Sequence, residues 1–219
     1  MCLTERRRRA QTDDGGFSLI ELVITVAILG IIAVVLLGVV FEYLKASRSA
    51  QTRLTESTDQ QFISTYWQTD VSSLGRRNYN PGTSDPVPTI QSVYVGAAGP
   101  GGCGSSVGSV VVAFAWIEYT VDASVPANAW TSTAQEVAYV RVGSAAPFAL
   151  QRVRCKAGVA GSPITVARNL TGTPTITCDT SCTGATLPQR VSMQFNVRDT
   201  SQPDSVGYTT TVSADRRQG

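Results

Sequence analysis

The chain has 219 residues, of which 42% are hydrophobic and 16% are charged. It is long enough for one domain with an appendage, or two small domains, and too apolar to be wholly disordered. It contains no histidine, which removes the commonest general base and the commonest metal ligand. We therefore expect neither an enzyme nor a cofactor. The formal net charge of +2 is smaller than the charge of the four arginines at residues 6–9 alone, so nucleic acid is not an expected partner.

The strongest signal is an uncharged run at residues 22–41. Of its 20 residues, 15 are Leu, Ile, Val or Phe. As a helix this run would be about 30 Å long, which matches the hydrocarbon thickness of a lipid bilayer. A buried core helix would need apolar surroundings on every side, which a chain of this size cannot easily supply. We predict a transmembrane helix over residues 17–41.

The basic residues set the expected orientation. The arginines at residues 6–9 precede the apolar run, and the positive-inside rule keeps such a cluster in the cytoplasm. A secretory signal peptide is the alternative, but the run is longer than a typical signal core and no Ala-x-Ala site closes it. We expect a single-pass protein of the cytoplasmic membrane, with its N-terminus inside and its C-terminal domain outside.

One carboxylate lies at the start of the apolar run. Glu21 follows Gly16, Phe17 and Ser18 within the segment Gly-Phe-Ser-Leu-Ile-Glu-Leu, and acidic residues in membrane segments usually have a partner. The basic leader, the glycine, the phenylalanine, the glutamate spacing and the apolar run together resemble the class III signal of type IV pilins and type II secretion pseudopilins. The detailed match covers about residues 6–45.

The resemblance implies a processing pathway and a set of partners. A membrane-bound prepilin peptidase would remove the leader, residues 1–16, by cutting between Gly16 and Phe17, and would N-methylate Phe17. Glu21 would pair with the N-terminal amine of a neighbouring pilin or pseudopilin subunit during filament assembly on a platform in the membrane. The implied function is a structural subunit, of the minor kind, that moves from the lipid bilayer into a cell-surface or periplasmic filament.

Residues 42–75 read as the exported continuation of the helix. They contain no proline, and Ile63, Tyr66, Trp67, Val71 and Leu74 recur at helical spacing before Gly75. Residues 76–108 are rich in Gly and Pro and predict a connecting loop with a short strand near Thr89–Val95. Within it, the Gly-rich stretch 99–104 lacks the Gly-Lys-Ser/Thr ending of a phosphate-binding loop.

From residue 109 to residue 219 the pattern is that of β-strands. Alternating apolar and polar residues predict antiparallel strands with short connections. The expected strands are residues 110–120, 136–142, 148–154, 164–169, 190–198 and 207–213. The predicted fold class is α+β, with the long N-terminal helix packed on a C-terminal antiparallel sheet, as the resemblance also implies.

Four of the five cysteines lie beyond the apolar run, which suits an oxidising compartment. They are Cys103, Cys155, Cys178 and Cys182. One possible pairing joins Cys178 to Cys182 and Cys103 to Cys155, and another joins Cys155 to Cys178. Zinc is the alternative to disulfides, but Cys-x3-Cys without histidine is a weak metal signal.

Two further readings remain open at this point. A DNA-binding patch formed by Arg76, Arg77, Arg152, Arg154 and Lys156 is less favoured than ordinary surface charge, because basic and acidic residues nearly balance after the leader. The alternative function is a membrane-anchored extracellular binding domain that does not enter a filament.

Overall fold

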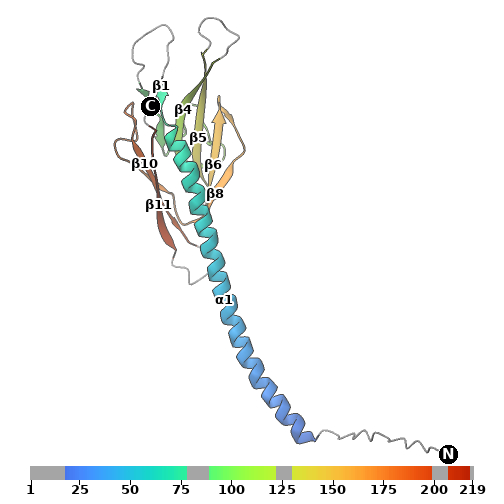
Figure 1. Ribbon diagram of the computed structural model, residues 1–219. Helices are drawn as coiled ribbons and strands as arrows, with labels where there is room; N and C mark the ends of the chain where they lie inside the picture. Colours follow the sequence, from blue (N-terminus) through green and yellow to red (C-terminus); the bar gives the residue numbers. More distant parts are fainter. Residues whose placement is uncertain (1–17, 78–88, 122–129, 199–206, 218–219) are drawn as a thin grey trace, which may run out of the picture. The chain divides into compact units, whose positions relative to one another are not determined.

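The structure consists of one long helix followed by a β-sheet domain (Figure 1). The computed structural model describes residues 18–77, 89–121, 130–198 and 207–217. The chain divides into two compact units, Met1–Gln51 and Thr52–Gly219. The predicted α+β class, with a helix before an antiparallel sheet, is confirmed.

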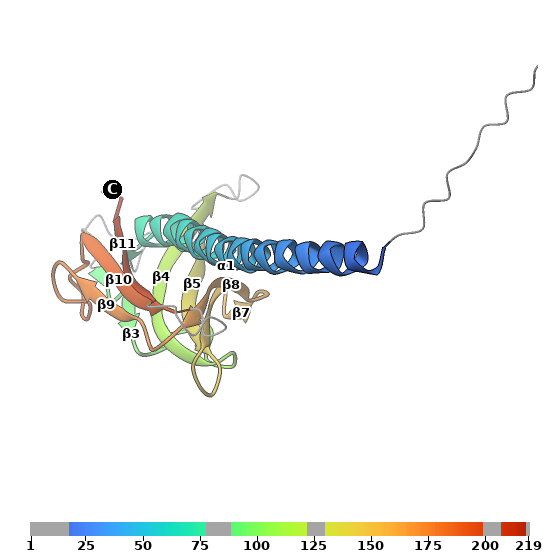
Figure 2. The same cartoon turned by 90° about the horizontal axis from the view of Figure 1, so that it is seen from below.

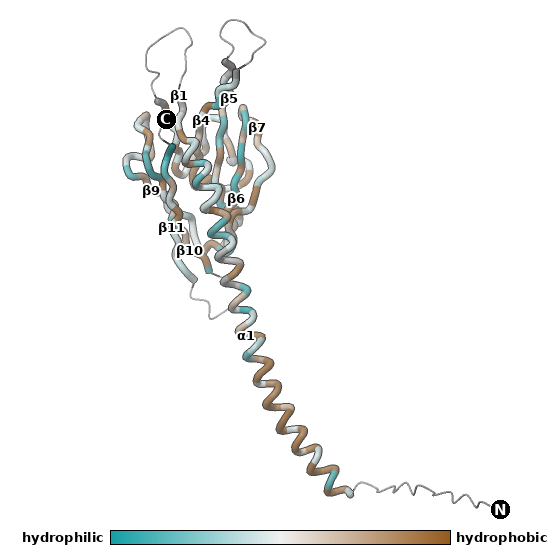
Figure 3. Tube along the Cα trace, in the orientation of Figure 1, coloured by the Kyte–Doolittle hydropathy of each residue, from teal (hydrophilic) through white to brown (hydrophobic). Residues whose placement is uncertain are grey.

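Helix α1 runs from Leu19 to Ser72, a length of 54 residues. Its first part is mostly apolar, as the predominantly brown colour in Figure 3 shows. At its other end the N–H of Leu74 donates to the carbonyl of Val71 (3.1 Å), which tightens the last turn. Gly75 follows with a φ of +142°, a conformation that favours glycine and lets the chain leave the helix.

Within the described part of the chain, the main sheet has nine strands, and the pairings between these strands are antiparallel. Its order is β11-β10-β8-β6-β5-β4-β3, with β7 beside β6 and β9 beside β10. A two-stranded sheet pairs β1 with β2. The strands are β1 (Arg76–Arg77), β2 (Thr89–Ile90), β3 (Val93–Val95), β4 (Ser109–Val121), β5 (Trp130–Val142), β6 (Phe148–Lys156), β7 (Val159–Ala160), β8 (Ile164–Leu170), β9 (Thr175–Cys178), β10 (Arg190–Val197) and β11 (Tyr208–Asp215).

The C-terminal part of α1 covers one face of this sheet (Figure 2). Ile63, Trp67 and Val71 are completely buried, and their spacing of four residues places them on one side of the helix. They pack against alternate residues of the strands, including Phe114 and Tyr139. Because side chains alternate along a strand, the residues between these point to the opposite face.

That opposite face has a smaller apolar cluster of its own. It contains Ala113, Ala138 and Val153 together with the buried Cys103 and Cys155. The three aliphatic residues come from β4, β5 and β6, while Cys103 comes from the segment that connects β3 to β4. The central strands are therefore covered on both faces.

The strand pattern differs from the sequence prediction in three ways. The single short strand expected near Thr89–Val95 is two strands, β2 and β3, which belong to different sheets. Strand β5 begins at Trp130, six residues before the expected start, because β4 extends to Val121 and pairs with Trp130. The short strands β1, β7 and β9 were not predicted, since two to four residues are too few to show an alternating pattern.

Candidate functional site

The N-terminal part of α1 exposes its apolar side chains. Within the segment Leu19–Gln51, the most apolar window of 18 residues has a mean hydropathy of 3.2, and none of that window is buried. It is the one helix among the described residues that is long and apolar enough to cross a membrane. Water is an unfavourable surrounding for such a surface, so the helix is compatible with a single-pass membrane anchor.

Glu21 lies in the first turn of α1 and its side chain is exposed. Ser18 precedes the helix, and its carbonyl accepts the N–H groups of Glu21 (2.9 Å) and Leu22 (3.2 Å). A carboxylate in this position is favoured by the unpaired N–H groups and the positive end of the helix dipole. The expected cleavage site, Gly16 and Phe17, lies outside the described residues.

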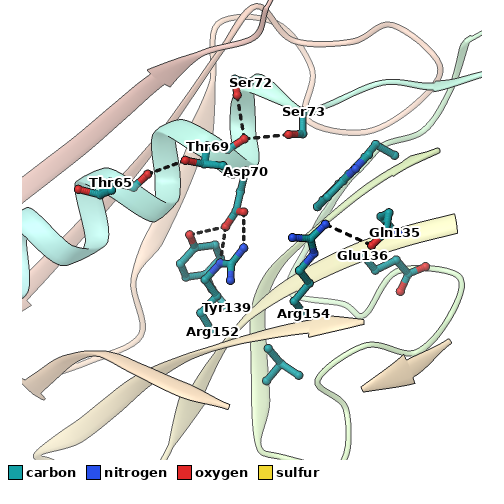
Figure 4. Close-up of polar contacts among 12 residues, drawn as sticks. Thr65, Thr69, Asp70, Ser72, Ser73, Gln135, Glu136, Tyr139, Arg152 and Arg154 are labelled. Carbon is teal, nitrogen blue, oxygen red and sulfur yellow. Dashed lines mark hydrogen bonds and ion pairs between the residues drawn. The ribbon is translucent and has the colours of Figure 1, made fainter. Parts of the chain in front are cut away.

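A buried group of polar side chains fixes the C-terminal part of α1 to the sheet. Figure 4 shows Arg152 and Tyr139 converging on the carboxylate of Asp70. Arg152 donates from Nε to Oδ2 (2.8 Å) and from Nη2 to Oδ1 (2.6 Å), and the Tyr139 hydroxyl donates to Oδ2 (2.7 Å). Asp70 is 1% exposed. Three donors therefore surround a carboxylate that would be costly to bury alone.

The protonation of this group follows from its surroundings. Burial, followed by the neighbouring Asp70 carboxylate, raises the pKa of Tyr139 well above its ordinary value, so the phenol stays a hydrogen-bond donor. Burial also lowers the pKa of Arg152, but the hydrogen bonds and charges of Asp70 and Tyr139 together raise that pKa above its ordinary value. The guanidinium also lies 4.8 Å from the ring centre of Tyr66.

Two more contacts attach α1 to strands β10 and β8, which lie between β6 and the β11 edge of the sheet. The indole N–H of Trp67 donates to the carbonyl of Val191 in β10 (3.0 Å), and Asp59 Oδ2 accepts the N–H of Arg168 in β8 (3.0 Å). Strands β8 and β10 share one residue pair, Leu170 and Val197. The helix thus joins two parts of the sheet that are only weakly paired with each other.

Two disulfides occur in the β-sheet domain. They join Cys103 to Cys155 and Cys178 to Cys182, which is the first of the two pairings considered from the sequence. All four thiols are thereby used, and among the described residues no group of His, Cys, Asp or Glu could hold a metal ion. The zinc alternative is therefore wrong for these cysteines.

Of the basic residues considered as a DNA-binding patch, Arg152 and Arg154 have carboxylate partners in the structure. Arg152 is buried against Asp70, whereas Arg154 is about half exposed and pairs with Glu118 (3.2 Å). Carboxylates from α1 and β4 therefore account for the charge of both arginines without an external anion.

Comparison with known proteins addresses the N-terminal segment. Residues 12–37 match the family model described as the prokaryotic N-terminal methylation motif. The chain carries a type IV pilin-like prepilin signal. This match includes Gly16, Phe17 and Glu21 and continues into the exposed apolar part of α1. No curated protein and no solved structure matches the chain.

The prepilin signal points to a structural protein rather than an enzyme. It was recognisable from the sequence because its residues lie next to one another along the chain. The Asp70 group was not recognised, although one signal was present. Asp70 interrupts the apolar positions Trp67, Val71 and Leu74 of an amphipathic helix, and a carboxylate on the buried face of a helix requires a buried partner.

Proposed function

We propose that the chain is the precursor of a minor subunit of a type IV pilus or a type II secretion-like pseudopilus. The observation that carries the proposal is the methylation motif at residues 12–37, which leads directly into an exposed apolar helix. Prepilin peptidase would cut after Gly16 and methylate Phe17. The processed chain keeps its membrane anchor, unlike a protein released by an ordinary signal peptidase.

Glu21 supports a specific mode of assembly. After cleavage, the amine of Phe17 carries a positive charge, and Glu21 carries a negative charge four residues further along. Either charge alone is costly in an apolar medium, but a carboxylate of one subunit next to the amine of another lowers the cost for both. We infer that this pair selects the axial position at which a new subunit enters the filament.

The β-sheet domain would be carried on the outside of the membrane. Its two disulfides suit an oxidising compartment, which agrees with the orientation expected from the arginines at residues 6–9. The buried contacts at Asp70 and Trp67, and the more exposed contact at Asp59, would keep the domain attached to the helix through which the subunit is assembled.

The first test is the intact mass and N-terminal sequence of the membrane-extracted protein. In a bacterium that has prepilin peptidase, the chain should begin at Phe17 and be heavier by one methyl group. In a strain without the peptidase it should begin at Met1. A Met1 start in both strains, or a cut beyond Phe41, would overturn the proposal and leave a membrane-anchored or secreted binding domain.

The second test separates processing from assembly. Glu21→Ala should be cut and methylated normally but should be strongly depleted from sheared filaments. Glu42→Ala is the matched control, because it removes the next carboxylate along α1 and should leave incorporation unchanged. Equal incorporation of both variants would contradict the role given to Glu21.

A further inference from the structure

The Gly-rich segment between β3 and β4 holds a carboxylate of the protein itself. The backbone N–H of Gly101 donates to Glu136 Oε1 (2.6 Å), and the N–H of Cys103 donates to Oε2 (3.4 Å). Glu136 is only 6% exposed. Among the described residues no Lys or Arg forms an ion pair with it. The loop N–H groups are therefore the polar partners that these residues provide for a buried carboxylate.

This approach is possible because the loop lacks side chains where it meets the carboxyl group. A Cβ atom at Gly99 would lie 3.0 Å from the Glu136 carboxyl group, and a Cβ atom at Gly101 would lie 3.1 Å from it. Both distances are shorter than ordinary van der Waals contact. The glycines thus let the backbone close over the carboxylate, in the way that N–H-rich loops surround external anions.

Glu136 also stands next to both members of a disulfide. In the β5–β6 ladder it is directly opposite Cys155, and its Oε2 accepts the N–H of Cys103. Cys103 and Cys155 are bonded to each other and each is 2% exposed. The carboxylate of Glu136 therefore accepts a hydrogen bond from the backbone of Cys103, while the backbone of Glu136 pairs with that of Cys155.

We propose that Glu136 is a positioning residue that seats residues 99–104 on the sheet before oxidation and so directs Cys103 to Cys155. Cys178 and Cys182 are the competing partners that the chain offers in the same compartment. Holding two thiols at bonding distance raises their effective concentration for each other. This inference does not depend on the proposed filament function, because it concerns how the exported domain acquires its disulfides.

The chemistry requires a disulfide oxidant, for which glutathione disulfide serves. The thiolate of one cysteine attacks a sulfur of glutathione disulfide, forming a mixed disulfide and releasing one glutathione thiolate. The second cysteine then loses its proton and attacks the protein sulfur of the mixed disulfide, releasing the second glutathione. Two protein thiols are oxidised and one glutathione disulfide is reduced to two glutathione molecules.

The two effects of a nearby carboxylate have opposite signs, which makes the proposal testable. A negative charge close to a thiol disfavours the reactive thiolate, so on electrostatic grounds alone, removing it should speed oxidation. A positioning role predicts the reverse. Glu136→Gln keeps the shape, but its amide offers only one acceptor oxygen to the two N–H groups.

The experiment uses the full-length chain in detergent with Cys2→Ser, reduced and then oxidised with glutathione disulfide. Peptide mass mapping follows each disulfide with time. For Glu136→Gln we expect the rate and the equilibrium constant for forming the Cys103–Cys155 bond to fall about tenfold to hundredfold, as for the loss of a charge-assisted hydrogen bond. The Cys178–Cys182 bond should form at its normal rate. Gly101→Ala, which keeps the charge but blocks the approach, should act in the same direction.

Glu118→Gln is the control, because it removes an exposed carboxylate from the neighbouring strand β4 and should change neither disulfide. Unchanged or faster formation of the Cys103–Cys155 bond in Glu136→Gln would overturn the proposal. Slowing of both disulfides by the same factor would also overturn it, because that result indicates general unfolding rather than positioning.

Discussion

The apolar side chains of α1 are exposed in its N-terminal part, Leu19–Gln51, and buried against the sheet in its C-terminal part, residues 52–72. Between Leu19 and Gln51 the large aliphatic side chains are exposed along the whole length of the helix. Between Thr52 and Ser72 the helix is mostly polar, and Ile63, Trp67 and Val71 are completely buried against the sheet. One continuous helix therefore contains a part that has no apolar partner among the residues that the structure describes and a part that has one.

This difference distinguishes apolar residues of α1 that stabilise the β-sheet domain from those that do not. The apolar residues of the C-terminal part stabilise the domain, because burying each large side chain contributes about 1.5–3 kcal/mol. Those of the N-terminal part contribute nothing to that core, and the proposed function gives them lipid or other subunits as their apolar surroundings. The predictions below test this separation with substitutions that should affect one part and leave the other unchanged.

The largest effect is expected from two charges in the apolar part. Ile28→Arg together with Ile32→Arg should cost about 5–7 kcal/mol for insertion at the centre of a membrane helix, which is comparable to the total contribution of the aliphatic residues. We expect the doubly substituted chain to be released from membranes by alkaline extraction, whereas the natural chain remains in the pellet.

The matched control places two arginines on the same helix beyond the apolar part. Leu54 and Phe62 are also exposed, at 69% and 48%, so Leu54→Arg with Phe62→Arg adds the same charge outside the proposed span. This control should stay in the membrane. Equal release of the two doubly substituted chains would show that the apolar part of α1 does not lie in lipid.

The next effect concerns the buried ion pair in the C-terminal part. Asp70→Ala leaves the Arg152 guanidinium and the Tyr139 hydroxyl without their acceptor. Removing one partner of a buried ion pair costs about 3–5 kcal/mol. We expect a loss of this size in the free energy of unfolding, measured by urea denaturation of the full-length chain in detergent with tryptophan fluorescence. Membrane extraction should not change.

An exposed ion pair of the same domain provides the comparison. Asp215 pairs with Arg190 across β10 and β11 (2.8 Å), and both side chains are more than half exposed. Asp215→Ala should therefore have little effect, because water solvates the remaining charge. If Asp70→Ala destabilises the domain no more than Asp215→Ala does, the buried group is not what holds the helix on the sheet.

Much of the fold was predictable because its signals are local. The alternation of Val191, Met193, Phe195 and Val197 with polar residues gave strand β10 to within one residue at its C-terminal end. The helical recurrence near Trp67 gave the C-terminal end of α1 to within three residues, while its expected start at Phe17 lies outside the described residues. The predicted strand at residues 136–142 was too short because residues 130–135 show no alternation of apolar and polar side chains. These residues become part of β5 by pairing with β4, which lies next to them only in the folded chain.

The candidate site also has a part with local sequence signals, which was predicted, and a part that depends on distant residues, which was not. The methylation motif is contiguous and was recognised, whereas the partners of Asp70 are 69 and 82 residues away along the chain. The Gly-rich stretch was predicted to be a connecting loop, but the carboxylate that it holds, Glu136, comes from a strand 35 residues beyond Gly101. Sequence patterns reveal that a residue is unusual in its place; only the tertiary structure supplies the residue that compensates for it.

The smallest effect we predict is a change with pH. Tyr139→Phe removes one hydrogen bond to the Asp70 carboxylate and should cost about 1–2 kcal/mol at neutral pH. Burial raises the pKa of Tyr139 in the folded chain above its ordinary value near 10. As the pH rises past that ordinary value, the unfolded chain loses this proton and the folded chain keeps it, so the stability of the natural chain falls.

The difference in unfolding free energy between the natural chain and Tyr139→Phe should therefore shrink between pH 9 and pH 11. The contributions of the other tyrosines cancel in this difference. Tyr43→Phe, at a residue that is 72% exposed on α1, is the control, and its difference from the natural chain should stay constant over the same range. A difference for Tyr139→Phe that is equally constant would mean that the phenol ionises as readily in the folded chain as in the unfolded one. That result would contradict a closed contact between the helix and the sheet at Asp70.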